Sequence, residues 1–110
     1  MSKHKNLGEF EIMVLAALIR LGDDAYGVAV RKEIETRAGR EVTIGALYAT
    51  LSRLEDKGYV ATRQGEATPE RGGRAKRYYR LTALGQTQFH RSVAMLETML
   101  RGIAPWPEAP

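Results

Sequence analysis

Cysteine is absent from the sequence, which excludes disulfide bonds and any chemistry that depends on a thiolate. This absence fits a reducing cytoplasm, where we expect the protein to act. Long apolar runs are also absent, because the longest, residues 12–19, is far shorter than the ~20 residues that span a bilayer. The first ten residues lack the apolar run of a signal peptide. We therefore expect neither membrane insertion nor export.

Groupings that would indicate catalysis or metal binding are missing as well. The two histidines, His4 and His90, have no further ligands at a metal-binding spacing. The adjacent carboxylates Asp23 and Asp24 precede a predicted helix, where such residues are more often caps than catalytic pairs. There is no nucleophile elbow, Ser/His/Asp grouping or phosphate-binding loop. We therefore expect no enzyme, no metal and no cofactor.

The positive charge, by contrast, is concentrated in one short segment. The chain has 110 residues, a length typical of one small domain, and a net charge of +4. Residues 1–60 and 81–110 are each neutral, so the whole excess lies in residues 61–80. A positive field of this kind favours a polyanion or an acidic surface as partner.

Hydrophobic spacing predicts two helices at the start of the chain. Over residues 7–21, apolar side chains recur every three or four positions, and Gly22 is expected to end that helix. A second helix runs to Gly39, with one of the two aspartates as its cap. Its apolar stripe is thin, so we expect this helix to lie half exposed. The stripe consists of Val28, Ala29, Ile34 and Ala38.

A third helix is predicted over residues 43–57, and its two faces differ. Thr43 is a suitable N-cap, and Gly58 a suitable left-handed residue after the C-terminus. The apolar face is formed by Ile44, Leu47, Leu51 and Leu54. The opposite face is slim and carries Gly45, Ala46, Ala49, Ser52 and Arg53, with Tyr48 on its flank.

The slim face suits the major groove of DNA. That groove is about 12 Å wide, and short side chains let a helix backbone come close to the bases. Hydroxyl groups and the N–H groups at the start of the helix can reach phosphates or base edges. The short connection over residues 39–42 is typical of a helix-turn-helix. Taken alone, the small residues could equally face a neighbouring helix or water.

Two runs of strand-forming residues follow, at 59–64 and 76–81, and a turn-rich loop joins them. We expect a β-hairpin with a long basic tip, which together with the preceding helices makes a winged helix. A charged run is ordinarily a solvated surface, but this one coincides with the wing and holds the entire excess charge. The wing cations expected to contact DNA are Arg71, Arg74, Lys76 and Arg77.

Thr82 is expected to cap a final helix over residues 83–103, in which apolar residues follow a heptad pattern. A single helix at the end of a small domain has little core of its own to cover, so we expect it to pack against the same helix of a second subunit. The alternative is that it folds back on its own domain. The expected interface comprises Phe89, Val93, Leu96, Leu100 and Ile103, widened by Met95 and Met99, with Phe10, Met13 and Leu18 from the first helix.

The predicted fold is mainly α with a small β-hairpin, in the order helix, helix, helix, hairpin, helix. We assign residues 1–81 to a winged helix-turn-helix domain and residues 82–104 to a C-terminal dimerisation helix. Residues 105–110 contain three prolines and are expected to be irregular.

Five short motifs follow one another from the second helix to the last. They are Tyr26-Gly27, Gly45-x-Leu47-Tyr48, Leu51-x-x-Leu54-Glu55-x-x-Gly58-x-Val60, Gly73-Arg74 and Tyr78-Tyr79-x-Leu81-Thr82-x-x-Gly85. Each motif alone is weak, but their order and spacing closely resemble the PadR family of bacterial transcriptional regulators, over about residues 7–90.

The resemblance implies a dimeric winged-helix repressor whose third helix enters the major groove. The family's tyrosine in that helix corresponds to Tyr48, and its wing cations to Arg74, Lys76 and Arg77. A single final helix is typical of the short subfamily. Some short relatives bind flat aromatic drugs between tryptophans on that helix, whereas Trp106 lies beyond it here, so we do not expect such binding.

The sequence thus predicts a sequence-specific transcriptional repressor that binds double-stranded DNA as a homodimer. Twofold symmetry predicts an inverted-repeat operator. A small-molecule effector, if there is one, is expected at the dimer interface. The alternative is a winged helix that docks on acidic protein or RNA without operator specificity. The slim third helix favours DNA, since protein-docking helices more often expose large apolar anchors.

Overall fold

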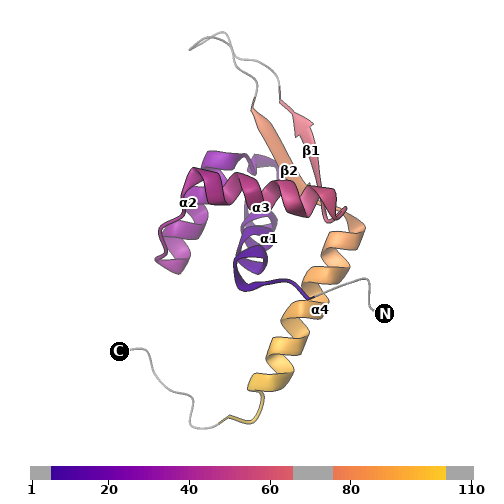
Figure 1. Cartoon of the computed structure of the whole chain (residues 1–110). Helices are drawn as coiled ribbons and strands as arrows, with labels where there is room; N and C mark the ends of the chain where they lie inside the picture. Colours follow the sequence, from indigo (N-terminus) through magenta and orange to yellow (C-terminus); the bar gives the residue numbers. More distant parts are fainter. Residues whose placement is uncertain (1–5, 66–75, 104–110) are drawn as a thin grey trace.

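The computed structural model describes residues 6–65 and 76–103 (Figure 1). The predictions for Arg71, Arg74, the glycine pair at 72–73 and residues 105–110 fall outside the described residues. The elements are α1 (Glu9–Leu21), a 3-10 turn η1 (Gly22–Asp24), α2 (Gly27–Ala38), α3 (Ile44–Asp56), β1 (Val60–Gln64), β2 (Arg77–Leu81) and α4 (Ala83–Leu100). This order confirms the predicted fold of three helices, a hairpin and a final helix.

The two strands form an antiparallel hairpin with a defined register. Val60 pairs with Leu81, and Gln64 pairs with Arg77. Leu81 and Val60 at the base of the hairpin are buried, whereas Gln64 and Arg77 at its far end are exposed. The hairpin is therefore anchored in the core at one end and extends away from the helices at the other (Figure 1).

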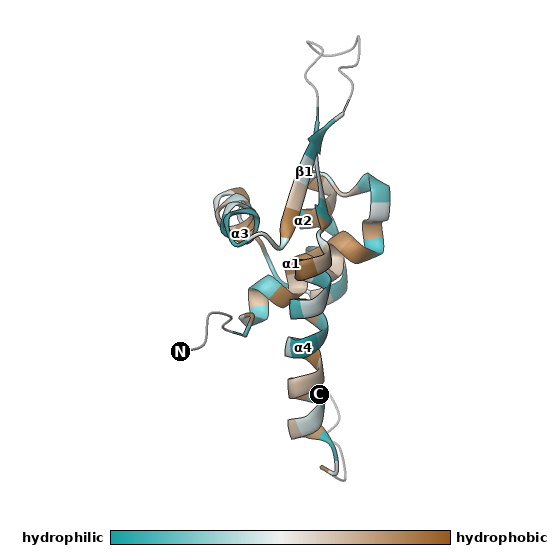
Figure 2. Cartoon of the chain, turned by 90° about the vertical axis from the view of Figure 1, so that its right-hand side faces the viewer, coloured by the Kyte–Doolittle hydropathy of each residue, from teal (hydrophilic) through white to brown (hydrophobic). Residues whose placement is uncertain are grey.

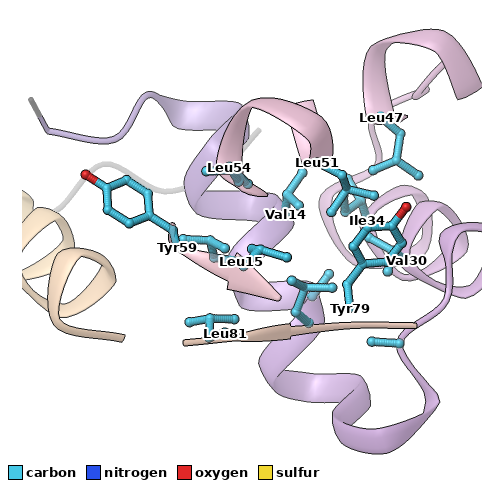
Figure 3. Packing of buried hydrophobic residues seen from close by; sticks show 14 of the residues in the cluster. Val14, Leu15, Val30, Ile34, Leu47, Leu51, Leu54, Tyr59, Tyr79 and Leu81 are labelled. Carbon is cyan, nitrogen blue, oxygen red and sulfur yellow. The ribbon is translucent and has the colours of Figure 1, made fainter. Parts of the chain in front are cut away.

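The hydrophobic core surrounds α1, which packs against α2, α3, α4 and β2. Figure 3 shows side chains from the first three helices and the hairpin converging on one cluster. Residues that are essentially inaccessible to water include Val14, Leu15, Val30, Leu47, Leu51 and Leu54. The packing of α3 and the hairpin onto α1 thus fixes the position of these two elements relative to each other.

The ends of α3 follow the predicted chemistry. Thr43 Oγ1 accepts a hydrogen bond from the N–H of Ala46 at 3.1 Å, as expected for an N-cap. At the other end Gly58 has φ +84°, and the N–H of Tyr59 donates to the carbonyl of Leu54 at 2.9 Å. This bond and that from the N–H of Gly58 to the carbonyl of Glu55, at 2.9 Å, satisfy terminal carbonyl groups of the helix as in a Schellman motif.

A threonine joins the end of α3 to the start of α4. Thr82 Oγ1 accepts from the N–H of Gly85 at 3.0 Å, which confirms the predicted cap, and donates to the carbonyl of Gly58 at 2.6 Å. Gly85 is in contact with the backbone of Tyr59, since a Cβ at Gly85 would lie 2.0 Å from the Tyr59 carbonyl oxygen. No side chain larger than hydrogen fits this junction.

The prediction for α2 was wrong in two respects. Neither aspartate caps the helix: both lie in η1, and the N-cap is Tyr26, without a side-chain hydrogen bond. Val28 is 61% exposed, whereas the buried positions include Val30 and Ile34. Val30 and Ile34 are four residues apart and share a face, whereas Val28 and Ile34, six apart, lie on different sides of a helix. Ala38 is exposed as well.

Two helix ends also differ from prediction. Ile44 was expected on the apolar face of α3 but is 39% exposed, because it is the first helical residue and lies beyond the first core position, Leu47. α4 ends at Leu100, three residues early, because Arg101 is extended and Gly102 has φ +85°. Ile103 therefore lies outside the helix.

Candidate DNA-binding surface

The outer face of α3 is exposed at every position where the sequence predicts DNA contact. Its inner face is buried, with Leu47, Leu51 and Leu54 in the core. Figure 2 shows α3 at the edge of the subunit, with its axis close to the line of view. The exposed residues are Thr43, Gly45, Ala46, Tyr48, Ala49, Ser52 and Arg53. DNA contact by these residues remains a prediction.

The shape of this face is set by its side chains. Gly45 has no neighbouring atom within 4 Å of an added Cβ, so the backbone there faces open space. Arg53 Nη2 donates to Thr50 Oγ1 of the same helix at 3.1 Å, which holds the guanidinium along the helix instead of leaving it free. Tyr48 is 41% exposed. The face is therefore slim at its start, with a guanidinium near its end.

The turn before α3 is held by a carboxylate. Glu35 Oε2, near the end of α2, accepts a hydrogen bond from the backbone N–H of Val42 at 3.0 Å. α2 ends at Gly39, as predicted, and this glycine has the left-handed conformation with φ +64°. Val42 itself is buried. These contacts fix the angle at which α3 leaves the turn.

The base of the wing carries a stack of cations and tyrosine rings. Lys76 Nζ lies 4.1 Å from the centroid of the Tyr26 ring, and the Arg63 guanidinium carbon lies 4.4 Å from the centroid of the Tyr78 ring. The two rings meet edge to face, with centroids 5.6 Å apart. Arg63 Nη2 also donates to the carbonyl of Asp23 at 3.2 Å. The stack joins both strands to the start of α2.

Tyr79, on β2, points into the hydrophobic core (Figure 3). It is buried, and its backbone N–H donates to the carbonyl of Ala25 at 2.8 Å. Burial raises the pKa of the Tyr79 phenol, and the nearby Arg77 guanidinium opposes that effect. The phenol is therefore neutral at physiological pH.

Glutamates pair with the cations of the helical body but not with those of the wing base. Salt bridges join Arg31 to Glu35, Arg37 to Glu33, Arg40 to Glu9 and Lys57 to Glu11. Among residues 6–65 and 76–103, no ion pair involves Arg53, Arg63, Lys76, Arg77 or Arg80. Arg53 of α3 and the cations of the hairpin, two elements that are packed side by side, thus have no carboxylate partner among these residues.

The C-terminal half of α4 extends beyond the other helices (Figures 1 and 2). Its residues buried against the subunit are Gly85, Gln88 and Ser92, all within its first ten residues. Most of the predicted dimer seam is instead open to solvent, while its first members are half-buried. The exposed apolar residues are Met95, Leu96, Met99, Leu100 and Ile103, and the half-buried ones are Phe89 and Val93.

The first helix contributes less to this surface than predicted. Leu18 is 3% exposed and belongs to the subunit's own core, so its assignment to the interface was wrong. Met13 lines a groove of about 340 Å³ between α1 and α4, together with Met95 and Leu96. Phe10 is half-buried and does not line this groove; the Arg40 guanidinium carbon lies 5.0 Å from the centroid of its ring.

Comparison with known proteins decides the family. The sequence model described as the Transcriptional regulator PadR-like family matches residues 14–91, which is most of the chain. The chain belongs to this PadR-like family. Members are transcriptional regulators rather than enzymes, so the predicted family and the predicted absence of an enzymatic role are confirmed. No curated protein sequence matches the chain significantly.

Solved structures share the PadR-like fold. A transcriptional regulator from Clostridium thermocellum is 26% identical, with a TM-score of 0.70 over 89% of each chain. A PadR family transcriptional regulator from Eggerthella lenta is 26% identical, with a TM-score of 0.67, covering 84% of this chain and 76% of that one. Bacillus subtilis PadR, solved in complex with operator DNA, is 21% identical, with a TM-score of 0.62 over 92% of this chain and 52% of its own.

Sequence reasoning missed part of this PadR-like surface. It did not assign a role to Tyr26, Arg63 or Tyr78, although the Tyr26-Gly27 and Tyr78-Tyr79 pairs were visible signals. Within the described ranges there is no group of three or more His, Cys, Asp or Glu side chains suited to a metal ion. None of the helices described is both long enough and apolar enough to span a membrane.

Proposed function

We propose that this PadR-like regulator is a repressor that binds an inverted-repeat operator as a homodimer. The observation that carries the proposal is the exposed, slim face of α3 beside the unpaired cations of the hairpin. DNA presents a groove that admits a narrow helix and flanking phosphates that attract positive charge. B. subtilis PadR, which has this fold, was solved with operator DNA.

In this proposal α3 reads the major groove. Gly45, Ala46 and Ala49 allow close approach of the backbone. Thr43 caps the N–H of Ala46, and the other N–H groups of the first turn bind a phosphate. The exposed part of the Tyr48 ring and the hydroxyl group of Ser52 contact base edges or phosphates, and Arg53 contacts the DNA backbone at the far end.

The wing supplies affinity that does not depend on sequence. Lys76 and Arg77 lie at its described base, and Arg71 and Arg74 belong to the same basic segment. We assign these cations to the phosphate backbone or the minor groove, where arginine and lysine side chains bind. Phosphate contacts position a protein on DNA, whereas contacts with base edges specify the site.

Dimerisation through α4 completes the proposal. Five exposed apolar residues on one short segment, 95–103, form a surface that a second copy can cover. The groove between α1 and α4 continues this surface and would receive side chains of the partner's helix. We place residues 82–104 in the dimerisation unit, and a small-molecule effector, where one acts, at this interface.

The experiment is selection of bound duplexes from a random pool by the wild-type protein, followed by affinity measurements with the enriched site. We expect an enriched inverted repeat with half-sites about one helical turn apart. Tyr48→Ala should weaken binding to that site about tenfold while the circular dichroism spectrum stays unchanged. If no duplex is enriched, or if RNA competes as well as the enriched duplex, the DNA-reading role is wrong.

A further inference from the structure

The two elements proposed to contact DNA meet at one dipeptide, Tyr26-Gly27. Tyr26 is the N-cap residue of α2, and Gly27 is the first residue of that helix. On one side Tyr26 contacts the wing, and on the other Gly27 contacts α3. The dipeptide belongs to neither DNA-contacting element, so its role is not explained by direct contact.

Tyr26 holds the base of the wing. Its backbone forms an isolated antiparallel bridge with Tyr78, and the two rings meet edge to face with centroids 5.6 Å apart. Lys76, which precedes β2, places its ammonium group 4.1 Å from the Tyr26 ring. A cation and an aromatic neighbour on the wing are thus both fixed on one ring of α2.

Gly27 holds the tyrosine of α3. A Cβ atom at Gly27 would lie 2.0 Å from the Tyr48 hydroxyl oxygen and 2.6 Å from Cζ, distances at which two atoms cannot coexist. The Tyr48 side chain therefore reaches back from α3 and rests on the Gly27 backbone. Gly27 does not have a positive φ, so glycine is required here for space and not for backbone conformation.

This contact restrains a side chain that is otherwise accessible. Tyr48 is 41% exposed, so nothing on its outer side prevents the ring from turning toward solvent. The contact with Gly27 defines where the Tyr48 ring lies before DNA arrives, which reduces the side-chain entropy lost on binding. A methyl group at residue 27 would displace the Tyr48 ring from this position.

We propose that Tyr26-Gly27 positions the recognition tyrosine relative to the wing, and that Gly27 controls operator affinity through Tyr48. Gly27 is a positioning residue, because it acts through the ring that rests on it. This inference depends on the proposed function of α3. In addition, α2 sets the distance between the Tyr48 side chain and the wing, although α2 itself belongs neither to the recognition helix nor to the wing.

Gly27→Ala separates this role from a role in folding. Alanine favours the helical conformation more than glycine does, and the displaced group is the far end of a flexible, partly exposed side chain. The thermal midpoint should therefore stay close to wild type. Gly85→Ala would behave differently, since its Cβ would meet the rigid backbone of Tyr59.

The test is a double-mutant cycle on operator affinity, measured by fluorescence anisotropy with the selected duplex. Gly27→Ala should weaken binding about five- to tenfold in the wild-type background and less than about twofold in Tyr48→Ala. Gly8→Ala is the matched control, because an added Cβ there meets only Glu11 Oε1 at 3.9 Å. It should bind as wild type does.

A second measurement needs no DNA. In the free protein, nuclear Overhauser contacts should join the Gly27 α protons to the Tyr48 ring, and Gly27→Ala should abolish contacts between residue 27 and that ring while core contacts of Leu51 persist. The positioning role is wrong if Gly27→Ala binds the operator as tightly as wild type, or if it loses the same affinity in the wild-type background as in the Tyr48→Ala background. Either result leaves the proposed function of α3 untouched. A wild-type protein that enriches no duplex overturns the proposed function, and this inference with it.

Discussion

The wing should leave a measurable signature in the salt dependence of DNA binding. Lys76 and Arg77 are exposed and form no ion pair among the described residues. If each contacts one phosphate, a dimer releases the counterions of four phosphates through these side chains. At a slope of about 0.9 per phosphate, they contribute about 3.6 to the dependence of log affinity on log salt concentration.

Lys76→Ala combined with Arg77→Ala should therefore flatten that slope by about 3 to 4. Between 50 and 200 mM salt, a slope of 3.6 corresponds to a change in affinity of about a hundredfold, which the variant should no longer show. The effect should be equal for the operator and for an unrelated duplex, since phosphate contacts do not read sequence. Fluorescence anisotropy over a potassium chloride series measures both.

Arg20→Ala combined with Arg37→Ala is the matched control. These arginines line a groove between α1 and α2, and Arg37 is paired with Glu33. The control removes the same formal charge from each subunit, so the long-range field changes equally while the phosphate contacts remain. If both double variants flatten the slope alike, net charge rather than the wing governs binding; an unchanged slope in the wing variant would remove Lys76 and Arg77 from the interface.

Three further predictions concern the cap, the seam and a buried phenol. Thr82→Val should lower the free energy of unfolding by about 1–2 kcal/mol, seen in urea titrations, because it loses both hydroxyl hydrogen bonds, while Thr82→Ser should retain most of it. If α4 pairs with a second copy as proposed, Leu96→Asp should give a monomer in sedimentation velocity, since it places a charge on the apolar seam; a dimer that persists would argue against α4 pairing. Burial raises the pKa of Tyr79, so the phenol ionises first in the unfolded chain and the free energy of unfolding should fall as pH rises above about 10. In alkaline thermal scans, the midpoint of Tyr79→Phe should fall less than that of wild type. An equal fall in both proteins would exclude this phenol as the cause.

The features that could be predicted from sequence are those with local causes. The threonine caps at 43 and 82 and the glycine after α3 depend on the backbone groups of one turn, which neighbouring residues determine. The slim and apolar faces of α3 followed from spacing alone. The hairpin was visible because strand-forming residues flank a turn-rich loop.

The features that could not be predicted depend on contacts between distant segments. Periodicity shows that Leu18 is apolar but not whether its own core or a second subunit covers it. The face of α2 was a different kind of error, because helical spacing already separates Val28 from Ile34 and joins Val30 to it. The contact of the Tyr48 side chain with Gly27 joins residues 21 positions apart in sequence, and no local rule connects them.

The junction at Thr82 has a mechanical consequence. Hydrogen bonds from Thr82 to the end of α3 and the close contact of Gly85 with Tyr59 leave no free joint between α3 and α4. α4 has 18 residues and is ~27 Å long, so it acts as a lever rigidly attached to α3. In a dimer, a tilt of roughly 5° about the far end of this lever would displace α3 by about 2 Å, which is enough to move it out of register with the groove.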